Sequence, residues 1–213
     1  MREKRLLRRI IQYLIGLCCM AFAAVLLKRT CWGISPVTAV ADAMALVLPM
    51  SLGTTTVIIH GLCVIGQMVV QRRVTIKTLL TIVVGFVFGY MVDFFAWIFN
   101  PDMLLWQKII ALAAGVAIQG LGVALVSGCD MMLPAPDELT NVISRTYNKK
   151  LSRVKIVADA TYVAIALVIN LISTGTLASV GIASVVSVVC TGFFVGVFYK
   201  LMPWIKMPTF FMT

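Results

Sequence analysis

The chain has 213 residues, of which 61% are hydrophobic and 12% charged, and its mean hydropathy is +1.03. Soluble domains carry about 25% charged residues, so half that share leaves too little polar surface to keep the protein in water. The net charge of +10 does not indicate nucleic-acid binding, because Lys and Arg gather between apolar blocks instead of along a basic face with interleaved aromatic residues. We therefore expect an all-α membrane protein.

The chain begins with a basic stretch, Met1–Arg9, followed by an apolar run, Ile10–Leu27. This order also fits a signal peptide with Ala21-Phe22-Ala23 as its cleavage site. We interpret the run as a retained first span, because its 18 apolar residues exceed the usual signal core.

Five further apolar blocks are long enough to cross a bilayer, which takes roughly 20 residues in a helix. They are Thr54–Val70, Val74–Phe99, Gln107–Val126, Val154–Ile172 and Leu177–Tyr199. Two shorter segments, Ser35–Leu48 and Ala135–Tyr147, do not span comfortably. We predict six transmembrane helices plus two short re-entrant or half helices. Eight crossings are the alternative, because a short tilted helix can be enclosed by its neighbours.

The basic residues favour six crossings. With six, the side that carries both termini holds Arg2, Lys4, Arg5, Arg8, Arg9, Arg72, Arg73, Lys77, Arg145, Lys149, Lys150, Arg153, Lys155, Lys200 and Lys206, and the other side holds only Lys28, Arg29 and Lys108. If the first short segment alone crossed, the cluster around Arg72 would move to the poorly charged side. Since Lys and Arg concentrate in cytoplasmic loops, we predict cytoplasmic N- and C-termini.

The two halves of this single membrane domain (residues 1–213) resemble each other. Residues 1–100 form the first repeat and residues 107–206 the second. At an offset of 99, Gly16-Leu17 falls on Gly115-Val116 and His60 on Asp159; at an offset of 107, Gly85 and Gly89 fall on Gly192 and Gly196. Each match is weak alone, but their common order along the chain indicates an internal repeat.

Three crossings in each half make the repeats inverted, because the second half enters the membrane from the other side. In transporters, inverted-topology repeats place a binding site near the bilayer midplane, at broken or short helices. Pro36 and Pro136 suit the first turn of the two short helices. A helix that starts inside the membrane directs free N–H groups and its positive dipole end to the interior, where an anion can bind.

At these residues the sequence resembles the YitT/YczE family of bacterial membrane proteins, from roughly Leu6 to Met202. The resemblance rests on Trp32-Gly33-Ile34-Ser35-Pro36-Val37-Thr38 and Leu133-Pro134-Ala135-Pro136-Asp137-Glu138, on Leu52-Gly53 and Leu151-Ser152, and on Asp93 and Asp159. Where the family usually has aspartate, this chain has Thr38 and Glu138. The resemblance implies a bacterial inner-membrane protein with inverted halves and says little about the substrate.

Ionisable groups inside the bilayer cost about 2.5–3.5 kcal/mol each and therefore require a reason. His60 and Asp159 lie at related positions of the two halves. They can form a pair that handles protons or substrate, since histidine titrates near neutral pH. Alternatively they fix helix packing, with Asp159 paired to Lys155 one turn earlier.

The two short helices supply the other candidates. Asp137 is explained by capping its helix, but Glu138 is explained less well if the helix is re-entrant. Asp42 has no basic partner within its apolar segment. We predict that substrate is bound by Ser35, Thr38, Asp42, His60, Asp137, Glu138, Asn141 and Asp159.

Two glycine pairs, Gly85/Gly89 and Gly192/Gly196, allow close helix approach. We expect them to pack the two halves together, with a homodimer through either pair as the alternative. The six cysteines form no CxxC motif and His60 is the single histidine, so we predict neither a metal site nor a cofactor.

These features favour a transporter or channel for a small molecule or ion. The alternative is a non-transporting scaffold or regulator whose short basic loops contact membrane lipids. An intramembrane enzyme is least favoured, because the sequence has neither HExxH nor GxSxG.

Overall fold

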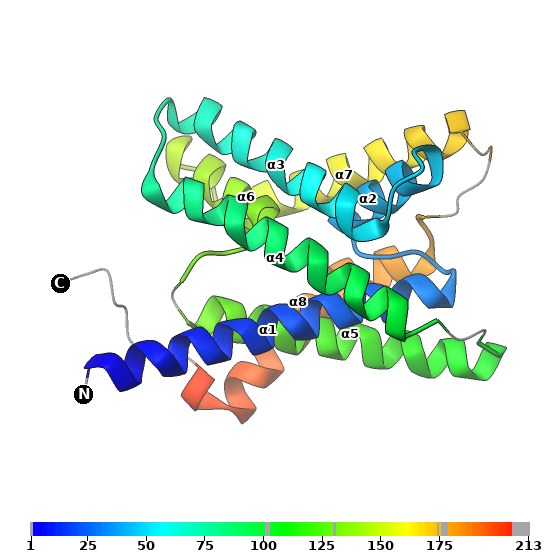
Figure 1. Ribbon diagram of the computed structural model, residues 1–213, viewed down its shortest axis with the longest axis horizontal. Helices are drawn as coiled ribbons and strands as arrows, with labels where there is room; N and C mark the ends of the chain where they lie inside the picture. Colours follow the sequence, from blue (N-terminus) through cyan, green and yellow to red (C-terminus); the bar gives the residue numbers. More distant parts are fainter. Residues whose placement is uncertain (1, 101–102, 130, 174, 176–178, 206–213) are drawn as a thin grey trace.

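The computed structural model describes residues 2–100, 103–129, 131–173, 175 and 179–205, and every regular element in this part of the chain is helical (Figure 1). The long helices are α1 (Arg2–Thr30), α3 (Leu52–Gln71), α4 (Ile76–Ile98), α5 (Leu105–Gly128), α7 (Leu151–Ser173) and α8 (Ile182–Leu201). Two helices of 12 residues, α2 (Pro36–Val47) and α6 (Ala135–Thr146), follow α1 and α5, and a short 3-10 turn, η1 (Pro203–Ile205), follows α8.

The predicted set of six long apolar helices is confirmed, since each is long and apolar enough to cross a membrane. Their outer faces carry large apolar side chains such as Trp97, which is 81% exposed, and Ile172, which is 83% exposed. Apolar surface of this extent is unfavourable in water and favourable in lipid. The protein is therefore a multi-pass helical membrane protein. Leu177, the expected start of the sixth span, lies outside the described residues.

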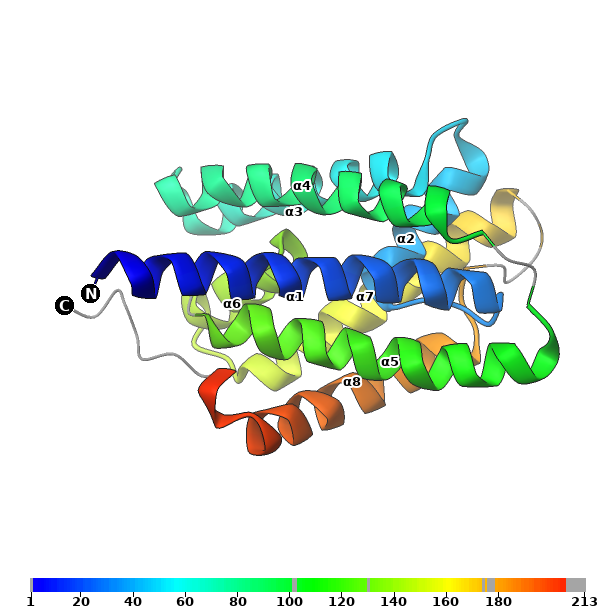
Figure 2. The same cartoon turned by 60° about the horizontal axis from the view of Figure 1, so that its bottom comes forward.

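The connections between helices lie at two ends of the bundle (Figure 2). The start of α1, the α3–α4 turn, the end of α5, the α6–α7 turn and the end of α8 share one end, which we call the basic end. There Arg9 Nη1 donates to the Cys129 carbonyl at 3.2 Å, and Gln12 Nε2 donates to the Ile205 carbonyl at 2.9 Å. These bonds join α1, α5 and η1. Lys206, expected at this end, lies outside the described residues.

The two half helices enter the bundle from opposite ends (Figure 1). After α1, residues 31–35 turn back into the bundle, and α2 then runs outward to the end where α3 begins. Gly33 has φ +101°, a conformation that glycine adopts without strain. After α5, residues 131–134 lead from the basic end into the bundle, and α6 runs outward to that end again. Both half helices therefore have their N-termini inside the molecule.

The long helices pack in an ordered pattern. Antiparallel α1 and α5 form the largest contact and run side by side (Figure 2). Helix α4 packs on α1, and α8 packs on α5; α2 packs on α3 and α7, and α6 packs on α7 and α3. Helix α3 also packs closely on α4, whereas α7 and α8 hardly touch.

The contact between α3 and α4 depends on glycine. A Cβ placed on Gly85 would lie 2.9 Å from Cβ of His60, and one on Gly89 would lie 2.7 Å from the Gly53 carbonyl oxygen. Gly85 and Gly89 therefore join two helices of the first half. The expectation that this pair packs one half against the other is wrong, and its surface is already filled within the chain.

Candidate functional site

A cavity of about 450 Å³ lies where the half helices begin. Its lining includes exposed side chains of α7 and α8, namely Leu151, Ile156 and Val188. Among the predicted site residues, the cavity brings together Ser35, Thr38, His60, Asp137, Asn141 and Asp159, and it adds Gln119, Lys155, Ser187 and Thr191. Six of the eight predicted residues thus share one site.

Both half-helix N-termini are uncapped. The first-turn N–H groups of an α-helix have no acceptor within the helix. Neither Ser35, at the N-cap of α2, nor Pro134, at the N-cap of α6, provides a side-chain cap. The Ser35 hydroxyl is instead hydrogen-bonded to the Thr38 hydroxyl at 2.8 Å. Two positive helix ends therefore face one cavity.

One lysine bridges the two carboxylates of the cavity. Nζ of Lys155 lies 2.7 Å from Oδ1 of Asp137 and 3.0 Å from Oδ1 of Asp159. The pairing of Asp159 with Lys155 one turn earlier is confirmed. Asp137 lies in the first turn of α6, where a carboxylate stabilises the positive helix end as expected, and it also joins α6 to α7 through the lysine. Together the three groups carry one surplus negative charge.

Four residues that line the cavity carry a buried polar atom with no hydrogen-bond partner among the described residues: His60 Nδ1, Gln119 Oε1, Ser187 Oγ and Thr191 Oγ1. Ser187 is 2% exposed, and His60, whose ring stacks on Phe88 with centroids 5.5 Å apart, is 3% exposed. A buried polar group without a partner costs about 1–3 kcal/mol. Such groups around one cavity are expected where a ligand or water completes the bonds.

The sequence reasoning missed Gln119, Ser187 and Thr191. Gln119 gave a usable signal, because it is a strongly polar residue in an otherwise apolar span. Ser187 and Thr191 gave none, since hydroxyl side chains in membrane helices commonly bond to the backbone of their own helix.

Asp42 and Glu138 lie outside the cavity. Oδ1 of Asp42 is 2.8 Å from Nζ of Lys28, and Ser179 donates to its other oxygen at 2.8 Å. Oε1 of Glu138 is 3.1 Å from Nζ of Lys77, beside a hollow of about 280 Å³ at the basic end. Each buried acid therefore ties its half helix to a long helix, and Asp42 has the basic partner that its own segment lacks.

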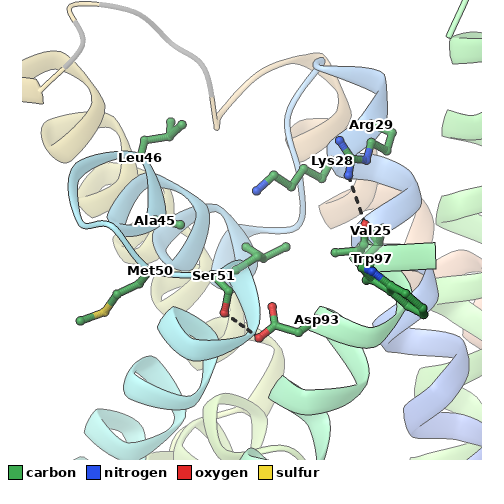
Figure 3. Close-up of a pocket in the computed structure, with 11 residues that line it drawn as sticks. Val25, Lys28, Arg29, Ala45, Leu46, Met50, Ser51, Asp93 and Trp97 are labelled. Carbon is green, nitrogen blue, oxygen red and sulfur yellow. Dashed lines mark hydrogen bonds between the residues drawn. The ribbon is translucent and has the colours of Figure 1, made fainter. Parts of the chain in front are cut away.

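A hollow of about 570 Å³ opens at the end opposite the basic end (Figure 3). There Asp93 accepts hydrogen bonds from the Ser51 hydroxyl at 2.6 Å and from the Gly53 N–H at 2.7 Å, which caps the start of α3. Arg29 donates to the Ala96 carbonyl at 3.3 Å. Because these charged groups already have partners, the hollow is weaker as a binding site than the cavity between the half helices.

Within the part of the chain that the structure describes, no group of three or more His, Cys, Asp or Glu side chains is placed to hold a metal ion. The absence of a metal or cofactor in the working protein stays a prediction.

Fold and site define a multi-pass helical membrane protein with two half helices that begin at one polar cavity. The chain belongs to a family of unknown function, DUF6198, which it matches over residues 7–200. Neither the curated proteins nor the solved structures contained a match. The family match does not name YitT/YczE, so that resemblance stays a prediction.

Proposed function

We propose that this protein is a transporter that carries a small solute across a bacterial inner membrane through the cavity between α2 and α6. The observation that carries the proposal is the convergence of two uncapped helix N-termini and several unpartnered polar side chains on that cavity. A purely structural bundle gains nothing from buried polar groups without partners. A solute that enters the cavity satisfies them.

Contacts between the halves support inverted-topology repeats. A Cβ on Gly16 would lie 2.8 Å from Val126, and a Cβ on Gly115 would lie 2.9 Å from Leu27. At the offset of 99, Gly16 corresponds to Gly115 and Leu27 corresponds to Val126. The two contacts are therefore equivalent, as a two-fold axis between the halves requires. Cys63 and its counterpart Tyr162 also meet, with Sγ 3.4 Å from the hydroxyl oxygen. Residues that touch their own counterparts lie on such an axis.

One pair of helices departs from this symmetry. Helix α4 packs on α3 through Gly85 and Gly89, but α8 hardly touches α7, and no described residue lies within 4 Å of a Cβ placed on Gly192 or Gly196. Residues of both helices beside this gap line the cavity, and the start of α7 and the end of α8 lie at the basic end. In a carrier with inverted repeats, the binding site becomes accessible from the other side of the membrane when the two halves exchange conformations. The asymmetry therefore supports a carrier in a state open toward the basic end, which we place in the cytoplasm from its Lys and Arg content.

Flux into proteoliposomes tests the proposal. Purified protein is reconstituted and supplied with labelled amino acids, carboxylates and inorganic ions in turn. We expect saturable uptake of one class, absent from empty vesicles. If correctly folded, reconstituted protein moves none of them, the protein is not a transporter of these solutes and a scaffold or regulatory role is favoured.

A further inference from the structure

The charges around the cavity indicate the class of solute. Resting on the transport function proposed above, we infer that the cavity binds a small zwitterion with an apolar side chain, such as an apolar α-amino acid. The juxtaposition that carries this inference is an acid-free helix N-terminus on one side of the cavity and a carboxylate-rich cluster on another.

The charge balance excludes a simple ion. Asp137, Asp159 and Lys155 leave one surplus negative charge, and each helix N-terminus supplies about +0.5 of an elementary charge. The sum is near zero, so the cavity matches a ligand of zero net charge. A lone anion at the start of α2 would leave the surplus negative charge of the cluster uncompensated, and a lone cation beside the cluster would leave the positive end of α2 uncompensated.

The charges are nevertheless separated in space. The first turn of α2 contains no acidic residue, whereas that of α6 contains Asp137 and Glu138. A carboxylate is stabilised at the uncapped start of α2, where Val37 and Thr38 present backbone N–H groups. An ammonium group is stabilised beside Asp137 and Asp159, on the α6 and α7 side.

The unpartnered side chains match both ends of such a ligand. The Ser187 and Thr191 hydroxyls can donate hydrogen bonds to a carboxylate, and Gln119 Oε1 can accept one from an ammonium. Ser187 is independent evidence for a ligand, because the residue lines the cavity, is 2% exposed and has a hydroxyl without a partner among the described residues.

The remaining wall selects an apolar side chain. Met20, Ile59, Phe88 and Val123 line the cavity. A volume of about 450 Å³ accommodates an amino acid of moderate size together with a few waters.

Three matched compounds test the inference on the full-length protein in detergent. L-leucine carries both charges, 4-methylpentanoate lacks the ammonium, and 3-methylbutylamine lacks the carboxylate. We expect L-leucine to raise the melting temperature in a saturable manner and to bind at least tenfold more tightly than either analogue. Ser187→Ala and Gln119→Met should each weaken leucine binding at least tenfold. Tyr147→Ser, at an exposed position outside the cavity, should leave it unchanged.

The outcomes separate this inference from the transport function. Equal binding of 4-methylpentanoate or of 3-methylbutylamine, or no binding of leucine, overturns the zwitterion site. Leucine binding without leucine flux in proteoliposomes upholds the site and contradicts transport. Flux of another solute class without leucine binding upholds transport and overturns the zwitterion.

Discussion

Lys155 is the residue on which the charge balance of the cavity depends. Its ammonium lies between Asp137 and Asp159, on two different helices, and its side chain is 40% exposed. Without it, two carboxylates would face each other in a poorly solvated site. Repulsion of this kind raises the free energy of the folded state unless a carboxyl takes up a proton.

Lys155→Met is therefore expected to lower the free energy of unfolding by about 1–3 kcal/mol, less than the 3–5 kcal/mol of a fully buried pair because the lysine is partly solvated. The measurement is reversible denaturation in detergent. Lys150→Met, at an exposed position, is the control and should change stability by less than about 0.5 kcal/mol. Adding Asp159→Asn to Lys155→Met should recover part of the loss. Equal stability of the lysine variant and its control would contradict the role of Lys155.

The unpartnered polar groups should behave in the opposite way. Thr191→Val removes a hydroxyl that has no hydrogen-bond partner among residues 2–205 as far as the structure describes them. Since a buried polar group without a partner is unfavourable, the melting temperature should stay equal or rise. Uptake of the transported solute into proteoliposomes should fall at least tenfold. Unchanged uptake, or a large loss of stability, would show that Thr191 has a structural role instead.

At the level of single residues, the sequence predicts which acidic residues are unusual but not which lysines pair with them. The charge of Asp42 was recognised as unusual, and its partner Lys28 was not predicted, because the two meet only when residues 31–35 turn back into the bundle. The same holds for Glu138 and Lys77, which lie on separate helices. Only the i,i+4 pair of Lys155 and Asp159 could be predicted from spacing alone.

Among the elements, the two glycine pairs show how one sequence motif has two different surroundings. Gly85 and Gly89 are covered by α3, whereas a Cβ on Gly192 or Gly196 would meet none of the described residues within 4 Å. The motif permits close approach but does not specify the partner helix, so its use within the first half could not be read from the sequence.

Gly89→Ala and Gly196→Ala form a matched pair of tests. The first places a Cβ 2.7 Å from the Gly53 carbonyl oxygen and against Val57, and it should lower the free energy of unfolding by about 1–3 kcal/mol. The second meets nothing within 4 Å and should be neutral or stabilise α8 by up to about 1 kcal/mol. Thermal denaturation of both variants checks that Gly89→Ala loses more stability than Gly196→Ala. A larger loss for Gly196→Ala would contradict the arrangement of α7 and α8.

The half helices were the elements best predicted from local signals. Pro36 and Pro136 mark their first turns, and the observed bounds Pro36–Val47 and Ala135–Thr146 agree with the expected segments to within one residue at each end. Their short length disfavours them as spans, since 12 residues of helix rise only about 18 Å. Which neighbours they contact depended on tertiary packing that no local pattern encodes.

The whole molecule is expected to alternate between two states. If α8 closes onto α7 as α4 closes onto α3, Gly192 and Gly196 must come into contact with α7. Gly196→Leu, at a position that does not line the cavity, should then fold normally and bind solute, but its uptake into proteoliposomes should fall at least tenfold. Gly196→Ala, with a smaller side chain, should lose less. Full uptake by the leucine variant would contradict closure at this interface.

The inverted repeats and the shared cavity both depend on how the helices are arranged across the membrane. Labelling with a membrane-impermeant maleimide in intact cells tests this arrangement most directly. Native Cys31 is exposed at the end opposite the basic end, whereas Cys129 is fully buried and burial raises the pKa of its thiol to about 11, which keeps it protonated and unreactive near neutral pH.

The account predicts that Cys31 is labelled from outside the cell, whereas Arg72→Cys and Lys149→Cys, each in a Cys31→Ser background, are labelled only after the membrane is permeabilised. Labelling of Arg72→Cys and Lys149→Cys from opposite sides of the membrane would contradict it, because the two halves would then not be inverted and the half helices would not meet at one cavity.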